Sequence, residues 1–180
     1  MTLSGHDDYV GFCTFSPDRH HILSASNDRK LRIWDVESGE CCMVLEGHGD
    51  GIRQCKYSVD GSRIASRSGD GTARIWDAET GACLSMLGPH AGEVHSCAFS
   101  PDAHHLATGC EDNQLRVWDT SEVTCLHTLA GHLGDLMSEA WSDDGEAQDG
   151  ISCDYSPDEA SRLAGRARLL PIRLTRHTSD

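Results

Sequence analysis

Short segments of alternating hydrophobic and polar residues run along the chain, separated by turn-forming residues. Alternation with a period of two is the pattern of a half-buried β-strand. Over the first 46 residues this pattern predicts four strands, at Val10–Phe15, His21–Ser26, Leu31–Trp34 and Cys41–Leu45. The segment Asn27-Asp28-Arg29 predicts a tight turn between the second and third strands. The chain therefore opens with the pattern of a small four-stranded sheet.

The same pattern returns every 42 residues. The residues that recur in phase are His6, His48, His90 and His132; Trp34, Trp76 and Trp118, each followed by Asp; and Phe15, Tyr57, Phe99 and Trp141. At the tight turn, Gly71 and Asn113 suit a positive φ in the second and third units, whereas Arg29 in the first does not. A repeated sheet of this size cannot bury both faces alone, so the units are expected to stack side by side.

The first two units begin with a Gly-His pair and reach a Trp-Asp pair, the signature of propeller blades with a period of about 40–45 residues. The pairs run from Gly5-His6 to Trp34-Asp35 and from Gly47-His48 to Trp76-Asp77, while Gly88-Pro89-His90 keeps only the His. On these motifs the chain resembles the WD-repeat family from residue 3 to about residue 144. The resemblance implies an all-β fold of four-stranded antiparallel blades, in an incomplete propeller of three to four blades.

The repeats divide the chain into a WD-repeat region at 1–144 and a tail at 145–180. Within the first region, three full repeats occupy about 5–46, 47–88 and 89–130, and a partial fourth occupies 131–144. The period fails after Asp144, where the sequence becomes polar and patternless. We therefore expect the tail to be irregular and poorly ordered.

Composition narrows the class of partner. The chain carries 15 Lys+Arg against 29 Asp+Glu, a formal net charge of −14. An acidic chain repels the phosphate backbone, so nucleic acid is not an expected partner. No apolar run of about 18 residues is present, so no membrane span is expected, and the first residues do not show a signal peptide.

Nine cysteines in a small chain raise the question of disulfides. Six of them recur in phase at equivalent strand positions, namely Cys13, Cys55 and Cys97, and Cys41, Cys83 and Cys125. Cys in such positions acts as a small buried apolar side chain. The expectation is therefore buried, reduced thiols and an intracellular, cytoplasmic location.

A His, a hydroxyl, an Asp and a Trp recur in each unit. The sets are His6, Ser24, Asp28 and Trp34; His48, Ser66, Asp70 and Trp76; and His90, Thr108, Asp112 and Trp118. A hydroxyl, a His and an Asp could form a hydrolase site, but three equivalent active sites in register are not plausible. The resemblance implies instead a structural tetrad, in which the indole N–H and the His both bond the hydroxyl and the His bonds the Asp. No catalytic residue is predicted.

Two His pairs, His20-His21 and His104-His105, could suggest a metal site. Adjacent strand residues point to opposite faces, so each pair offers at most one ligand to a single site. They are expected to be exposed turn residues, and neither a metal nor a cofactor is predicted.

The resemblance also implies three partner-contacting positions in each unit, next to the start of the first strand and before the tetrad Asp. These are Tyr9, Gly11 and Asn27; Gly51, Arg53 and Gly69; Glu93, His95 and Glu111; and Asp135 and Met137 of the partial unit. Tyr9, Arg53, Glu93, His95 and Glu111 are the predicted partner-binding residues. Arg67, where the other units have Ala25 and Gly109, is either a further binding residue or a costly departure from the pattern.

The sequence therefore predicts a non-enzymatic scaffold or adaptor whose partners are other proteins. Propellers usually contain about 4–8 blades, so three blades and a fragment also predict self-association or docking to further blades. The alternative is a fragment of the regulatory propeller of a larger ATP-dependent signalling protein, although this chain contains no GxxxxGK[ST] motif.

Overall fold

A computed structural model describes residues 2–130, 139–141 and 147–149. It contains three antiparallel sheets, each of four strands paired in chain order, which confirms the all-β prediction. The first blade consists of β1 (Val10–Phe15), β2 (His21–Ser26), β3 (Lys30–Asp35) and β4 (Cys41–Glu46). The predicted strands of this unit therefore lie within one residue of the observed ones.

The next two blades repeat this plan. The second consists of β5 (Ile52–Tyr57), β6 (Arg63–Ser68), β7 (Ala73–Asp77) and β8 (Cys83–Leu87). The third consists of β9 (Val94–Phe99), β10 (His105–Cys110), β11 (Gln114–Asp119) and β12 (Cys125–Ala130). A two-stranded sheet follows, formed by β13 (Glu139–Trp141) and β14 (Ala147–Asp149).

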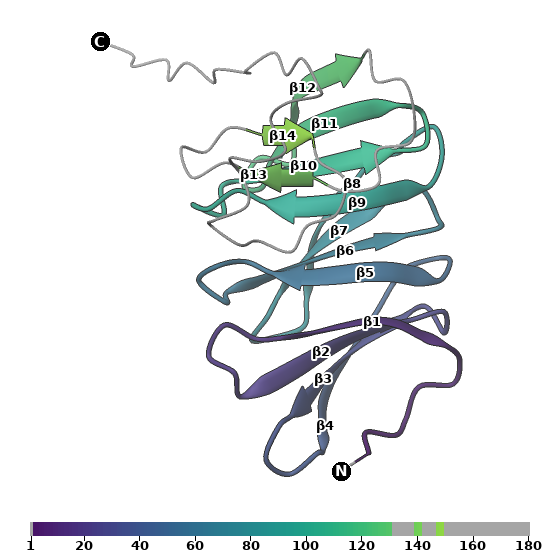
Figure 1. Cartoon of the computed structure of the whole chain (residues 1–180), viewed down its shortest axis with the longest axis vertical. Coiled ribbons are helices and arrows are strands. Elements are labelled where there is room, and N and C mark those ends of the chain that lie inside the picture. Colours follow the sequence, from purple (N-terminus) through teal and green to yellow (C-terminus); the bar gives the residue numbers. More distant parts are fainter. Residues whose placement is uncertain (1, 131–138, 142–146, 150–180) are drawn as a thin grey trace, which may run out of the picture.

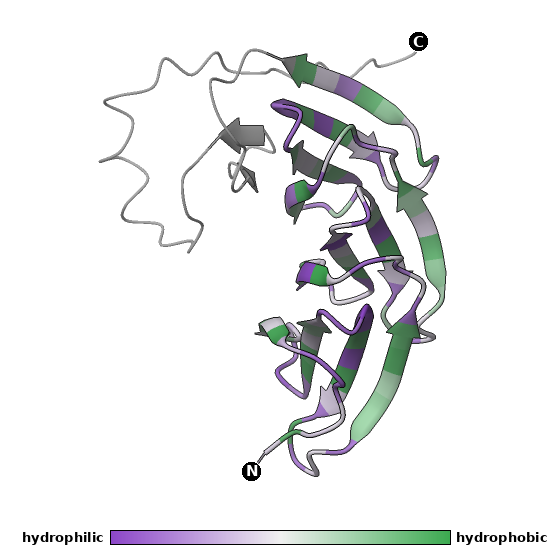
Figure 2. Ribbon diagram, turned by 90° about the vertical axis from the view of Figure 1, so that its right-hand side faces the viewer, coloured by the Kyte–Doolittle hydropathy of each residue, from purple (hydrophilic) through white to green (hydrophobic). Residues whose placement is uncertain are grey.

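The blades follow one another as a stack, with β1, β5 and β9 along one edge (Figure 1). Seen from the side, the three sheets lie along an arc that does not close into a ring (Figure 2). The strand β13 contacts β9 and β10, so it continues the row of first strands beyond the third blade.

The hydrophobic core lies between the blades. At the first junction, Leu23, Leu31 and Leu45 of blade 1 pack in one buried cluster with Ile64 and Trp76 of blade 2. The second junction joins side chains from blades 2 and 3 in the same way, namely Ala65, Ala73, Ile75, Leu87, Cys97, Leu106 and Trp118. Each blade therefore buries one face against its neighbour, as the stacking prediction requires.

Two expectations from the sequence are wrong. Of the six in-phase cysteines, only Cys55 and Cys97 are buried, and the other four are exposed; all the described cysteines are free thiols. Arg29 adopts a φ of 69° at the tight turn, the same conformation as Gly71 and Asn113. Most of the partial repeat at 131–144 and of the tail at 145–180 lies outside the described residues, but β14 falls within the segment expected to be irregular.

Candidate functional site: hydroxyl networks and the loop end of the blades

A buried hydroxyl is the centre of a hydrogen-bond network in blade 1. Trp34 Nε1 donates to Ser24 Oγ at 2.8 Å, and His6 Nε2 lies 2.7 Å from the same oxygen. His6 Nδ1 lies 2.7 Å from Asp28 Oδ2 at the tight turn. A ring proton on Nδ1 would donate to the carboxylate and leave Nε2 to accept the hydroxyl proton. All four residues predicted for this set are therefore in contact.

The same network forms in blade 2. Trp76 Nε1 and His48 Nε2 both lie 2.8 Å from Ser66 Oγ, and His48 Nδ1 lies 2.9 Å from Asp70 Oδ2. Burial lowers the pKa of His48, although Asp70 opposes the shift. Burial opposes ionisation of Asp70, but bonds from the Thr72 hydroxyl, the Gly49 amide and His48 outweigh it and hold its pKa at about 2.

The third network is incomplete, which corrects the expected tetrad. Trp118 Nε1 and His90 Nε2 lie 2.8 and 2.9 Å from Thr108 Oγ1, as in the other blades. His90 Nδ1 lies 3.0 Å from the carbonyl oxygen of Gly71, in blade 2, rather than bonding Asp112. Asp112 instead accepts two bonds from Arg116, at 2.6 and 3.2 Å, and this guanidinium is the main reason that its pKa is about 2.

A sequence difference in the residue before the His accompanies this change of partner. A Cβ added to Gly47 would meet Arg74 Nη1 at 2.7 Å, because that guanidinium lies close to Gly47 and over the ring of Trp76. Pro89 stands in the corresponding place in the third unit. The unit whose arginine bonds the Asp of the tight turn is therefore also the unit that has Pro89 in place of glycine.

The residues predicted to bind partners lie at one end of the blades, the end that carries the tight turns and the network histidines. Here Arg53 and His95 each occupy the second position of their first strand, where the strand pairing shifts by one residue. Gly11 has the same bulged position in blade 1. A β-bulge changes the direction of the extra residue's side chain and is common beside functional sites. The bulge therefore explains why Arg53 and His95 have equivalent placements at this end, which the sequence pattern did not reveal.

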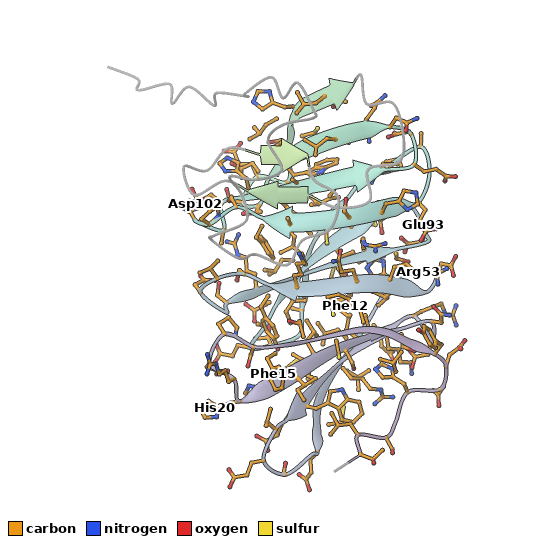
Figure 3. All side chains as sticks on the ribbon, viewed as in Figure 1. Phe12, Phe15, His20, Arg53, Glu93 and Asp102 are labelled. Atoms are coloured by element: carbon orange, nitrogen blue, oxygen red, sulfur yellow. The ribbon has the colours of Figure 1, made fainter. Side chains whose placement is uncertain are left out.

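Arg53 connects the three blades at this end. Its Nη1 donates to Asn27 Oδ1 at 2.8 Å in the turn of blade 1, and its Nε donates to Glu93 Oε1 at 3.2 Å before β9. Arg53 and Glu93 lie side by side at one edge of the array, with His20 and Asp102 at the opposite end (Figure 3). We call Tyr9, Asn27, Arg53, Glu93, His95 and Glu111 the loop-end surface.

The other predicted residues contribute unequally to this surface. Tyr9 is 70% exposed and Glu111 is also exposed, whereas His95 is half-buried. Glu111 Oε2 accepts a bond from the Glu93 amide at 3.3 Å. The smaller candidates Gly51 and Gly69 lie beside Asn27 and Asp50, respectively. Asp135 and Met137 lie outside the described residues.

Arg67 forms hydrogen bonds that connect blades 2 and 3. Its Nε donates to Gln54 Oε1 at 3.1 Å within blade 2, and its Nη1 donates to the Val94 carbonyl oxygen at 3.0 Å in blade 3. The structure therefore uses this departure from the repeat to join two sheets.

The described residues do not form a group of three or more His, Cys, Asp or Glu side chains able to hold a metal ion. Nor is any helix long and apolar enough for a membrane crossing found among them. A hollow of about 400 Å³ lies at the end opposite the loop-end surface, between blades 1 and 2, with Asp18, Tyr57, Asp60 and Asp77 in its lining. Ser16 and Ser58 donate to two of these carboxylates, and Thr80 to the third.

Similar proteins share short stretches of this chain. It is 51% identical over 39 residues to small ribosomal subunit protein RACK1 of Schizosaccharomyces pombe, over 22% of this chain and 12% of that protein. It is 50% identical over 40 residues to nuclear distribution protein nudF of Aspergillus flavus, over 22% of this chain and 9% of that protein. Lissencephaly-1 homolog 1 of Paramecium tetraurelia is 46% identical over 37 residues, over 21% and 9% of the two chains. The matched stretches span about a tenth of each relative.

The repeats themselves give a broader match. The family model described as WD domain, G-beta repeat matches residues 1–35, 39–77 and 81–119, which together are more than half of the chain. These regions contain the three Trp-Asp pairs and most of the strands of the three sheets. The chain therefore belongs to the WD-repeat family.

Proposed function

We propose that this chain is a protein-binding scaffold that contacts its partner through the loop-end surface. The observation that carries the proposal is the position of Arg53, whose guanidinium bonds Asn27 of blade 1 and Glu93 of blade 3. These bonds hold polar side chains from three blades in one continuous surface. Tyr9 adds an exposed aromatic ring, and Tyr and Arg are frequent anchors of protein interfaces.

The charge of this surface favours a basic partner. Asp8, Asp50, Glu93 and Glu111 lie in the turns and strand starts at this end together with the cations Arg29 and Arg53, and the chain carries a net charge of −14. Complementary charge mainly raises the rate of association and is screened by salt. We therefore infer a partner that presents Lys or Arg around an apolar contact for Tyr9.

We further propose that the three hydroxyl networks are structural rather than catalytic. Ser24, Ser66 and Thr108 are all buried, with exposed fractions of 5%, 0% and 0%. Each oxygen accepts an indole N–H and is closed off from solvent, so a substrate could not reach it. The free thiols support an intracellular setting for the scaffold. The relatives named above do not support the alternative of an ATP-dependent sensor.

A capture experiment tests the loop-end surface. The chain, the variant Tyr9→Ala/Arg53→Ala and the control Arg19→Ala/Val59→Ala are used as baits in extracts of native cells, with quantitative mass spectrometry. Arg19 and Val59 are exposed in turns at the opposite end of blades 1 and 2, so the control removes similar side chains. Partners captured by the wild type and the control should fall at least tenfold with the loop-end variant.

The melting temperatures decide whether such a loss is specific. The free energy of unfolding of both variants should lie within about 0.5 kcal/mol of the wild-type value, since their side chains lie at the surface. Their melting temperatures should therefore be close to that of the wild type. Equal capture by the loop-end variant and the wild type would contradict the proposal and move the binding site to the blade rims or the Arg-rich tail.

A further inference from the structure

The two junctions between blades differ at the end opposite the loop-end surface, which His20 and Asp102 mark in Figure 3. At the second junction, Arg63 of blade 2 reaches across to blade 3, where its Nη1 donates to Thr120 Oγ1 at 2.6 Å. Thr120 is 5% exposed, and its hydroxyl donates in turn to the Ala103 carbonyl oxygen at 3.0 Å. A guanidinium from the chain itself therefore lies between these two blades and has a buried acceptor there.

The first junction lacks both members of this pair. One 42-residue period before Arg63 stands His21, and one period before Thr120 stands Ala78. Both of these residues line the hollow of about 400 Å³ between blades 1 and 2. The His side chain is shorter than that of Arg, and Ala has no hydroxyl that could accept a bond. The hollow therefore lies at the place where the next junction holds a guanidinium.

The lining of this hollow carries negative charge. Its four carboxylates belong to Asp18, Asp60, Asp77 and Glu79. Within residues 2–130, 139–141 and 147–149, the salt bridges of Lys and Arg go to other acids, namely Glu46, Glu93 and Asp112. Hydrogen bonds from hydroxyl and amide groups of their own turns lower the pKa of the three Asp carboxyls in the lining. These carboxylates are therefore charged near neutral pH and lack a Lys or Arg partner in the described part of the chain.

An aromatic ring makes the hollow more selective. Tyr57 lines it and is half-buried against the core of the first junction. A cation beside an aromatic ring is attracted to the face of the ring. A guanidinium stacks on such rings and binds a carboxylate through two parallel bonds, whereas an ammonium is a compact point charge. The combination of a ring with carboxylates therefore favours Arg over Lys.

We propose that this hollow binds an arginine side chain of a partner protein, in the place that corresponds to that of Arg63 at the second junction. The observation that carries the proposal is the repeat itself, because the same position between two blades holds the chain's own guanidinium at one junction and is open at the other. The site lies at the opposite end of the blades from the loop-end surface, so it does not rest on the function proposed above. The net charge of −14 would also raise the rate at which a basic partner associates.

Nuclear magnetic resonance with the isotope-labelled full chain tests the site directly. The probe is the peptide acetyl-Gly-Arg-Gly-amide, and two matched peptides carry Lys or citrulline in place of Arg. Citrulline keeps the shape of Arg but is uncharged. The Arg peptide should shift the amide signals of residues 57–62 and 77–79, with a dissociation constant on the order of 1 mM. The Lys and citrulline peptides should bind at least about fivefold more weakly.

A variant that occupies the hollow with its own side chain is the sharpest test. His21→Arg/Ala78→Thr places the pair of the second junction in the first, and should remove the shifts that the Arg peptide causes. The reverse variant, Arg63→His/Thr120→Ala, should create a second site, with new shifts at residues 99–104 and 119–121. Each variant is the control for the other, because the two exchange the same residue types in opposite directions.

Charge variants test the carboxylates of the lining. Asp60→Asn/Asp77→Asn should weaken binding of the Arg peptide about tenfold or more, because Asn keeps an oxygen for the turn but loses the charge. The control Asp102→Asn/Asp119→Asn changes the equivalent residues at the second junction and should leave the dissociation constant unchanged. If Asp60→Asn/Asp77→Asn does not fold, as judged by circular dichroism, the variant that occupies the hollow decides, since its new residues are those that the equivalent positions of the repeat already hold.

Several outcomes would overturn the proposal. Binding of the Arg peptide that survives His21→Arg/Ala78→Thr, equal binding of the Lys or citrulline peptide, or no shift with up to about 10 mM Arg peptide would each do so. Shifts spread over the whole acidic surface would show non-specific attraction and would also contradict it. The loop-end variant Tyr9→Ala/Arg53→Ala should bind the Arg peptide as the wild type does, so that failure of one site is distinguishable from failure of the other. Loss of binding in that variant would place the peptide at the loop-end surface and overturn the assignment to the hollow.

Discussion

One buried hydroxyl oxygen in each blade joins an indole to an imidazole. The small Ser or Thr that carries this oxygen therefore contributes to the positions of two larger side chains. Ser66 is 0% exposed and has both Trp76 and His48 at 2.8 Å. An unpaired polar group in such a place loses its bonds to water without replacement. The hydroxyl of Ser66 on β6 therefore adds a side-chain link to Trp76 on β7 and to His48, beside the backbone pairing of the two strands.

Trp76→Phe should lower the free energy of unfolding by about 1–3 kcal/mol, because it keeps the aromatic bulk and leaves the Ser66 hydroxyl without its donor. Urea melts followed by circular dichroism would measure the loss. The double variant Trp76→Phe/Ser66→Ala should cost less than the sum of the two single changes, since the two residues interact directly. Additive costs would contradict a direct bond between them.

The network histidines should make stability depend on pH. Burial lowers the pKa of both His48 and His90 in the fold, below the ordinary value of about 6.5. The unfolded chain then binds protons more readily than the folded one, so stability should be lost as pH falls below about 6.5. Asp70, whose pKa is about 2, contributes stability above its ordinary value near 3.9 and loses it only in stronger acid.

Thermal melts between pH 7.5 and pH 5.5 would test this prediction. The melting temperature of the wild type should fall across this range. The variant His48→Gln/His90→Gln should be less stable at neutral pH and should show a flatter profile, because Gln does not titrate there. Parallel profiles for the two proteins would show that the histidines are not the cause.

At the scale of the strand, a junction between blades contains hydrogen bonds as well as packed apolar side chains. Arg67→Ala should lower the free energy of unfolding by about 1–3 kcal/mol, because it removes the bond to the Val94 carbonyl oxygen. Arg53→Ala is the matched control, since that guanidinium lies at the exposed end of the same junction. Equal costs for the two variants would contradict a special role for Arg67 in the junction.

The sequence predicted the strands well because three copies of one pattern constrain each other. The 42-residue period places β1 within its observed bounds and identifies the tight turn before β3. It does not show which copies differ. Arg32, Arg74 and Arg116 occupy equivalent positions, yet Arg116 bonds Asp112, in the unit where Pro89 rather than glycine precedes the His. The partner of this arginine depends on contacts in three dimensions, which strand periodicity does not report.

The cysteines show a second limit of the same kind. Cys13 and Cys55 have equivalent positions in their strands, but only Cys55 has a neighbouring blade over it. Burial at a junction therefore depends on what lies beside the blade rather than on the blade itself. The same holds for the loop-end surface, where Arg53 gains its partners from two other blades.

At the scale of the whole molecule, the junction cores hold the stack together. Leu23 is 0% exposed in the first junction, whereas Leu84 is 50% exposed on β8. Leu23→Ala should lower the free energy of unfolding by about 2–5 kcal/mol, through lost burial and the cavity it leaves. Leu84→Ala should change it by no more than about 0.5 kcal/mol. Denaturant titrations of both variants give the comparison, and equal effects would place the core elsewhere.

The equivalence of successive junctions also bears on how such a chain can change in length. A duplication or deletion of 42 residues adds or removes one whole sheet, and the new neighbours meet through surfaces of the same kind as before. A change of any other length puts the histidine, hydroxyl and indole of one unit out of register. Gene variants that add or remove whole 42-residue units should therefore give chains that still fold. Variants that add or remove any other number of residues within the repeats should give chains that do not fold stably.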